Sequence, residues 1–210
     1  TGASNALLKA MEEPPARTYF ILITQNVNEL LVTIRSRSQI YHFFPLTLSQ
    51  IRLSGIEDEL IVRWSAGSIG RSIDTDPTVL RERRDMLFAF LEKAMNAQEK
   101  ELAQLLTGGI DLSRAKDDYP EFLHILGILV SDLILILEGL DHRIVNIDIE
   151  TKLKELVTKT TLERLVQIAD CLKFIESNFK SYLNRQLTTD FLSLTLNETT
   201  SKFLAQNSRI

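Results

Sequence analysis

Two arginines lie two residues apart in the string T-I-R-S-R-S, at Arg35 and Arg37. An arginine side chain keeps its charge in proteins, and its planar guanidinium offers paired donors that match the oxygens of a phosphate. The pattern leaves two interpretations open. Both side chains are solvated turn residues, as most charged loop residues are, or one of them is held out to a phosphate group.

The sequence lacks the other parts of a nucleotide or metal site. A P-loop needs G-x-x-x-x-G-K-[ST], so that backbone amides and a lysine surround the phosphates. The nearest string, G-S-I-G-R-S at residues 67–72, has its glycines too close together and no lysine. The three histidines, His42, His124 and His142, have no metal-ligand spacing. We therefore expect this chain to bind neither a nucleotide nor a metal, and not to be an enzyme by itself.

The composition is that of an ordinary globular protein, with 44% apolar and 25% charged residues among 210. The net charge of −4 predicts that any contact with nucleic acid is local or shared with partners, because independent binding to phosphates favours a basic excess. The single cysteine, Cys171, excludes an internal disulfide and is interpreted as a small core residue. These features favour a reducing, cytoplasmic setting.

Residues 1–45 read as α/β. A helix capped by Ser4 or Asn5 is expected to end at the two prolines that follow E-E. The string T-Y-F-I-L-I-T at 18–24 and the string Q-I-Y-H-F-F at 39–44 predict two strands of a parallel sheet. Between them the sequence predicts short helical turns, one of them capped by Thr33.

Residues 46–75 predict short helices, and residues 76–210 predict longer ones. A helix should begin at Pro77 with Asp76 as its cap. Further helices are expected near 119–140, 149–157, 161–179 and 181–196. The expected core of this bundle consists of Leu87, Leu126, Val130, Leu133, Leu137, Leu165, Leu172 and Leu187.

The stretch 122–140 is apolar enough to approach membrane-spanning length. His124, Asp132 and Glu138 interrupt it, and charged groups inside a bilayer are costly. A buried helix of a soluble bundle is the preferred interpretation, and no membrane contact is expected.

Three strings together resemble bacterial clamp-loader subunits of the AAA+ family. N-A-L-L-K-A-M-E-E-P-P at residues 5–15, continuing to the strand-like 18–24, is similar to their N-A-L-L-K-x-L-E-E-P-P…F-I-L-x-T. T-I-R-S-R at 33–37 resembles their Ser-Arg-Cys loop, in the double-arginine form of delta-prime-like subunits of DNA polymerase III. N-R-Q-L-T-T-D-F-L at 184–192 is similar to their last collar helix.

The resemblance implies roles for five residues. Arg37 corresponds to the arginine finger that enters the ATP site of a neighbouring subunit, flanked by Ser36 and by Ser38 in place of the usual cysteine. Arg35 would be a supporting or DNA-facing charge. Thr24 lies where relatives sense their own nucleotide, and without a P-loop it is expected only to cap its strand.

The resemblance also implies an architecture. Residues 1–45 would be the C-terminal part of an AAA+ α/β domain, 46–75 a helical lid, and 76–210 a helical collar for oligomerisation, which makes the fold mainly α. The start of the chain suggests a C-terminal fragment lacking the P-loop region. Gly70 stands where ATP-binding relatives place a second sensor arginine, with Arg71 one residue later, and the role of Arg71 is left open.

The implied function is that of a noncatalytic clamp-loader subunit, which helps to load the sliding clamp onto primed DNA. ATP and Mg would be bound by neighbouring subunits, and the partners would be gamma/tau-type and delta-type subunits. Primed DNA and the clamp would be contacted through the assembled complex. One alternative is a stand-alone helical interaction module with a degenerate AAA+ arm, and another is an autonomous ATPase.

Overall fold

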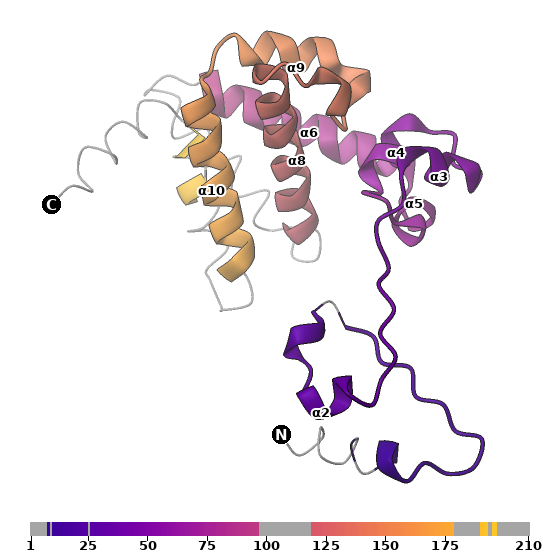
Figure 1. Ribbon diagram of the computed structural model, residues 1–210. Coiled ribbons are helices and arrows are strands. Elements are labelled where there is room, and N and C mark those ends of the chain that lie inside the picture. The colour runs from indigo at the N-terminus through magenta and orange to yellow at the C-terminus, as the bar shows by residue number, and fades with distance from the viewer. Residues whose placement is uncertain are drawn as a thin grey trace, which may run out of the picture. The chain divides into compact units, whose positions relative to one another are not determined.

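The computed structural model describes residues 8, 10–24, 26–96, 119–178, 190–192 and 195–196. The chain divides into two units, Thr1–Phe44 and Pro45–Ile210 (Figure 1). Across the described ranges the regular structure is helical and no strand occurs, which confirms a mainly α-helical protein. The further division into a lid and a collar stays a prediction.

The N-terminal unit consists of short helical turns joined by irregular chain. Its regular elements include the 3₁₀ turn η1 (Val27–Glu29) and the one-turn helix α2 (Val32–Arg35). Asn26 caps η1 by accepting a hydrogen bond from the backbone of Asn28. Thr33 lies inside α2, whose N-cap position is Leu31, so the predicted cap at Thr33 is wrong. The predicted cap at Ser4 or Asn5 lies outside the described residues.

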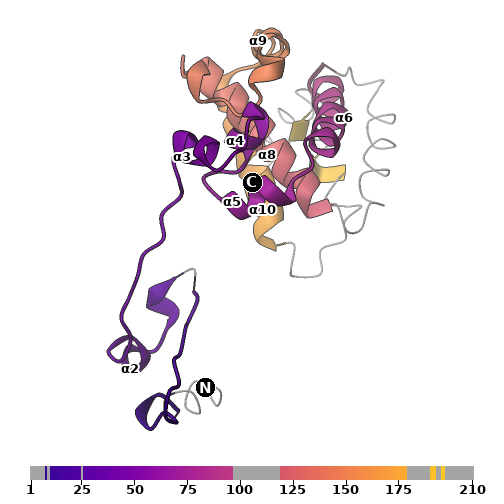
Figure 2. The same cartoon turned by 90° about the vertical axis from the view of Figure 1, so that its right-hand side faces the viewer.

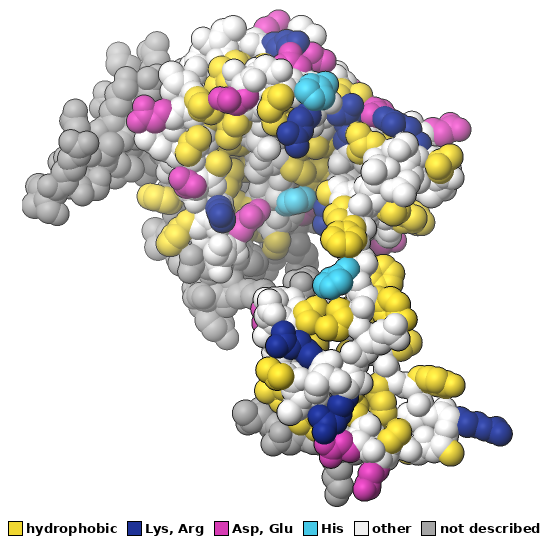
Figure 3. Space-filling view, in the orientation of Figure 1, with side chains coloured by type: hydrophobic (Ala, Val, Ile, Leu, Met, Phe, Trp, Pro, Cys, Tyr) yellow, Lys and Arg dark blue, Asp and Glu magenta, His cyan; other side chains and the backbone are white. Residues whose placement is uncertain are grey.

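The strands predicted at 18–24 and 39–44 do not form. Both segments are irregular, and side chains such as Tyr19 (91%), Ile23 (95%) and Phe43 (96%) are almost fully exposed. Strands of a parallel sheet need hydrogen-bonding neighbours and cover on both faces, and the described part of this unit supplies neither. Figure 3 accordingly shows hydrophobic side chains on the surface of the N-terminal unit.

The helical unit begins with three short helices, each with a side-chain cap. Thr47 and Gln50 form a reciprocal capping box. The Asp58 side chain accepts hydrogen bonds from backbone amides in the first turn of the second helix. The Ser68 side chain accepts one in the first turn of the third helix. These helices are α3 (Leu48–Leu53), α4 (Glu59–Trp64) and α5 (Ile69–Asp74).

The chain enters this unit through a close backbone contact at Gly67. The amide of Leu46 donates to the Gly67 carbonyl at 3.0 Å. Gly67 has a φ of +82°, and a Cβ atom there would lie 2.6 Å from both the Leu46 carbonyl oxygen and the Cβ of Pro45. A side chain at this position would therefore be strained and would clash with backbone, which explains the glycine.

Longer helices and two 3₁₀ turns complete the described part of the unit. They are α6 (Pro77–Asn96), α8 (Tyr119–Leu137), η3 (Asp141–Arg143), η4 (Ile147–Ile149), α9 (Glu150–Val157) and α10 (Leu162–Asn178). The Asp76 carboxylate accepts from the amides of Thr78 and Val79, so the predicted start of α6 is confirmed. α8 packs against α6, α9 and α10 (Figures 1 and 2).

Most of the predicted core is buried. Leu137 is 37% exposed and lies at the end of α8, so its assignment to the core was wrong. Leu187 lies outside the described residues. The confirmed core residues are Leu87, Leu126, Val130, Leu133, Leu165 and Leu172.

α8 is, among the described helices, the one long and apolar enough to cross a membrane by length and composition alone. Core helices of soluble proteins satisfy the same criterion. α8 contacts three other helices, and nine of its side chains are buried. These contacts favour the interpretation of α8 as the central helix of the bundle.

Candidate functional site: the Ser-Arg-Ser turn

The turn that follows α2 is tied down by its own serines. Ser36 Oγ donates to the Thr33 carbonyl at 3.1 Å, and Ser38 Oγ donates to the Ile34 carbonyl at 2.8 Å. The Ser36 bond gives the Thr33 carbonyl a partner at the end of the helix, and the Ser38 bond adds a second donor to the Ile34 carbonyl, which also accepts from the Arg37 amide at 3.2 Å. Ile34 is buried in the N-terminal unit, so the turn has a fixed point beneath it.

Arg37 projects from this turn with its guanidinium partly exposed. Its Nη1 donates to the Thr33 carbonyl at 3.2 Å, and its Nη2 lies 2.9 Å from Glu12 Oε1. The side chains of Arg37 and Glu12 are 43% and 52% exposed. The arrangement holds a phosphate-matching fork on a short supported turn, with one carboxylate beside it.

Arg35 points to a different partner. Its Nη1 donates to Asn28 Oδ1 at 3.0 Å, which connects α2 to η1. The Asn28 backbone is in turn bonded to the Asn26 side chain. This geometry fits a supporting charge, and the role of Arg35 in binding stays a prediction.

Thr24 organises the chain before η1. Its hydroxyl donates to the Asn26 carbonyl at 3.1 Å and accepts from the Asn26 amide at 3.2 Å. Because residues 18–24 form no strand, Thr24 shapes a turn and does not cap a strand as predicted. The predicted site residues thus lie in one unit, and the hydrogen bonds and ion pairs described here join Arg37 to Glu12 and to Thr33.

Sequence reasoning missed Glu12. It lies at the end of a short helical stretch, 25 positions before Arg37, and pairing over that distance leaves no periodic signal. The hint in the sequence was the acidic pair E-E directly before two prolines, where the helix must stop.

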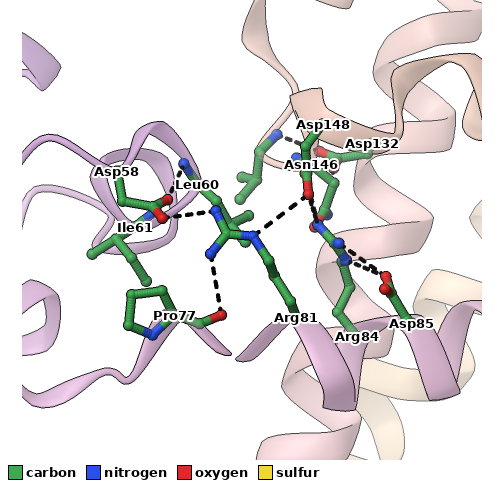
Figure 4. A network of polar contacts seen from close by, with 11 residues as sticks. Asp58, Leu60, Ile61, Pro77, Arg81, Arg84, Asp85, Asp132, Asn146 and Asp148 are labelled. Atoms are coloured by element: carbon green, nitrogen blue, oxygen red, sulfur yellow. Dashed lines mark hydrogen bonds and ion pairs between the residues drawn. The ribbon is translucent and has the colours of Figure 1, made fainter. Parts of the chain in front are cut away.

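A second group of charged residues connects the short helices to the bundle. Arg81 on α6 donates to Asp58 at 2.7 Å and approaches Asp148, whereas Arg84 donates to both Asp148 oxygens at 2.7 Å and to Asp85 (Figure 4). Burial alone would raise the pKa of Asp58, but bonds from Arg81 and from backbone amides outweigh it and lower that pKa. Each charged residue of this group has an ion-pair partner within the chain, so the group stabilises the contact between the short helices and the bundle.

The remaining titratable groups of interest are part of the core. Asp132 is buried on α8 and accepts from the amides of Val145 and Asn146 at 2.9 Å, while burial raises its pKa despite these bonds. Burial likewise raises the pKa of Cys171, which fits the predicted core thiol. Within the described ranges no cluster of His, Cys, Asp or Glu could hold a metal ion.

Comparison with known proteins agrees with the motifs. A family model described as DNA polymerase III, delta subunit, C terminal, matches residues 78–193, and one described as DNA polymerase III, delta subunit, matches residues 1–47. The first match covers more than half of the chain. Together the two models define the class as a subunit of DNA polymerase III.

Three relatives refine the class. The chain is 29% identical to DNA polymerase III subunit delta′ of Escherichia coli (strain K12) over 201 residues, covering 90% of this chain and 58% of that protein. It is 32% identical to subunit tau of Bacillus subtilis (strain 168) over 111 residues, which cover 52% of this chain and 20% of that protein. It is 57% identical to subunit delta′ of Yersinia pestis over 35 residues, which cover 17% of this chain and 10% of that protein.

The chain belongs to the delta′ family of DNA polymerase III clamp-loader subunits. This result confirms the resemblance inferred from the three strings. The chain spans 58% of the length of its Escherichia coli relative and a smaller share of the other two.

Proposed function

We propose that this chain is a noncatalytic subunit of the DNA polymerase III clamp loader and that it supplies Arg37, in trans, to the ATP site of a neighbouring subunit. The observation that carries the proposal is the partly exposed Arg37 fork on a turn anchored by buried Ile34. Family membership supports it, because the turn coincides with the Ser-Arg-Cys loop of such subunits.

The proposed chemistry is electrostatic. Charge develops on the γ-phosphate oxygens as the bond to the leaving group breaks, and a fixed guanidinium stabilises that charge. Contacts of this kind are worth about 10³–10⁵-fold in rate in well-studied phosphoryl-transfer enzymes. ATP and Mg would be held by the neighbouring subunit, and Arg37 would contribute one charged donor pair.

The proposal includes the other parts of the complex. The partners are gamma/tau-type and delta-type subunits, and the assembled loader places the sliding clamp on primed DNA in the cytoplasm. Residues 1–45 would be the C-terminal part of the AAA+ α/β domain, 46–75 the lid, and 76–210 the collar that joins sister subunits. The described short helices and bundle helices provide apolar and polar surfaces for such contacts.

The test uses a loader assembled from the complete subunits. Arg37→Ala should lower DNA-stimulated ATP hydrolysis by at least an order of magnitude, and Arg37→Lys should restore little, because a point charge does not reproduce the fork. Arg17→Ala, at another exposed arginine of the same unit, is the matched control and should leave the rate unchanged. Normal hydrolysis by a fully assembled Arg37→Ala complex would exclude the finger.

The alternative, a stand-alone helical interaction module, is favoured by one observation, the exposed apolar side chains of residues 18–24 and 39–44. Copurification separates the two functions. A clamp-loader subunit should enter a stoichiometric complex with gamma/tau-type and delta-type subunits, whereas an independent module should not.

A further inference from the structure

Both terminal nitrogens of Arg37 are already engaged by this chain. Nη1 is bound to the Thr33 carbonyl at 3.2 Å, and Nη2 is bound to the Glu12 carboxylate at 2.9 Å. A phosphate that takes the guanidinium by two parallel bonds needs both of these nitrogens or Nη2 with Nε. The Glu12 carboxylate therefore lies against Nη2, the nitrogen that both phosphate arrangements use, and places a negative charge beside the phosphate oxygens that would bind there.

We infer that Glu12 is a positioning residue that holds Arg37 in a resting position and competes with the nucleotide phosphate of the neighbouring subunit for it. The inference rests on the proposed role of Arg37 as a finger. It assigns a function to the acidic residue that precedes Glu13 and the two prolines.

Glu12 is suited to a reversible contact. The pair joins one carboxylate to a guanidinium, and both side chains are about half exposed, so water and salt weaken it. By contrast, Arg84 is only 3% exposed and has two carboxylate partners. A triphosphate carries more negative charge than one carboxylate, and it displaces Glu12 once the neighbouring site is filled.

The position of Glu12 is fixed by the local structure. It is the last helical residue before Glu13, Pro14 and Pro15, and the prolines prevent the helix from continuing. The adjacent Glu13 is exposed, and in the described part of the chain no ion pair with it is found. Glu13 is therefore a control position for Glu12, because the two neighbouring glutamates differ in their contact with Arg37.

The contact with Glu12 should therefore weaken nucleotide binding and leave the chemical step unaffected. Glu12 opposes the contact between Arg37 and the phosphate in the bound state and in the transition state equally, since it must leave in both. Removing its charge should tighten nucleotide binding and leave the maximal hydrolysis rate unchanged.

The experiment measures binding of a fluorescent non-hydrolysable ATP analogue to the assembled loader. Glu12→Gln and Glu12→Ala should each bind it more tightly, by up to about fivefold at low salt. The difference should shrink as ionic strength rises, because exposed ion pairs are screened. Glu13→Gln should match the wild type, and the kcat for ATP hydrolysis should be the same in all of these complexes.

The outcomes separate the two proposals. If Arg37→Ala weakens hydrolysis but Glu12→Gln binds the analogue like the wild type, or more weakly, the role of Glu12 is wrong and the finger stands. If Arg37→Ala has no effect, the finger and the Glu12 inference both fail. In the Arg37→Ala background, Glu12→Gln should change nothing, and a persistent effect there would also overturn the inference.

Discussion

Arg37 in the N-terminal unit and Arg84 in the helical unit both bind carboxylates, yet their surroundings differ. Arg37 is nearly half exposed and has one carboxylate partner, Glu12, whereas Arg84 is almost fully buried and bonds Asp85 and Asp148. An ion pair that a ligand displaces must be weak and open to solvent. An ion pair that holds helices together must be strong and shielded from solvent. Burial and number of partners, more than residue type, separate the two uses of arginine.

The same contrast extends to the hydrophobic residues. The helical unit buries a continuous set of leucines and isoleucines between α6, α8, α9 and α10, while the N-terminal unit exposes most of its large apolar side chains. Stability should therefore reside in the helical unit. Within that unit, the loss of stability on substitution should fall from the fully buried side chains to the partly exposed ones.

The largest effect should come from the core of α8. Leu133 is fully buried, and Leu133→Ala should lower the free energy of unfolding by about 2–5 kcal/mol, because it removes apolar contacts and leaves a cavity. Leu137→Ala is the matched control one helical turn later, where the side chain is partly exposed and the loss should be less than half as large. Urea unfolding of the native full-length subunit measures both, and equal losses would contradict the described packing.

The next effect should come from the buried arginine. Arg84→Ala removes the two shortest hydrogen bonds to Asp148, so it should lower the free energy of unfolding by about 1.5–3 kcal/mol. Arg52→Ala removes a pair with Glu59 at the surface of the same unit, so it should cost under about 1 kcal/mol. Thermal or urea unfolding at two salt concentrations tests the contrast, since the Arg52 effect should fade with salt and the Arg84 effect should not.

What the sequence predicted well was local. The start of α6 follows from Asp76 and Pro77, and the bundle core follows from leucines at helical spacing, because both depend on residues a few positions apart. The helical spacing of leucines did not predict that Arg84 is buried. Arg84 is buried because of Asp148, 64 positions away, and no helical period reports such a partner.

The errors in the N-terminal unit have the same origin. An apolar, β-branched run at 18–24 has the composition of a strand, but a strand forms only when other segments pair with it, and the described structure contains none that do. For the site, the string T-I-R-S-R indicated Arg37 and its serines directly. Its carboxylate partner at Glu12 required the folded chain, so the candidate site was predicted only in part.

The smallest effect concerns acid pH and the Asp58–Arg81 pair. The pKa of Asp58 is lowered in the folded chain, as hydrogen bonds from Arg81 and from backbone amides outweigh burial. A carboxylate with a lowered folded pKa contributes stability that is complete above its unfolded pKa, about 4, and that is lost as pH falls through the folded value. Asp58→Asn keeps the helix cap, because asparagine caps as well as aspartate does, but it removes the charge.

We therefore expect Asp58→Asn to cost under about 1 kcal/mol near neutral pH, because Arg81 is partly exposed. The difference from the wild type should begin to shrink as the pH falls below about 4, and it should disappear once the pH is below the lowered pKa that the carboxylate has in the folded chain. Asp132 works in the opposite direction, because burial raises its pKa and protonation then favours the folded state, so Asp58 has to be isolated by comparing the variant with the wild type at each pH. Urea unfolding across this range measures the difference. A gap that stays constant on acidification would show that Asp58 acts through its cap alone and that the ion pair adds nothing to the fastening between α4 and α6.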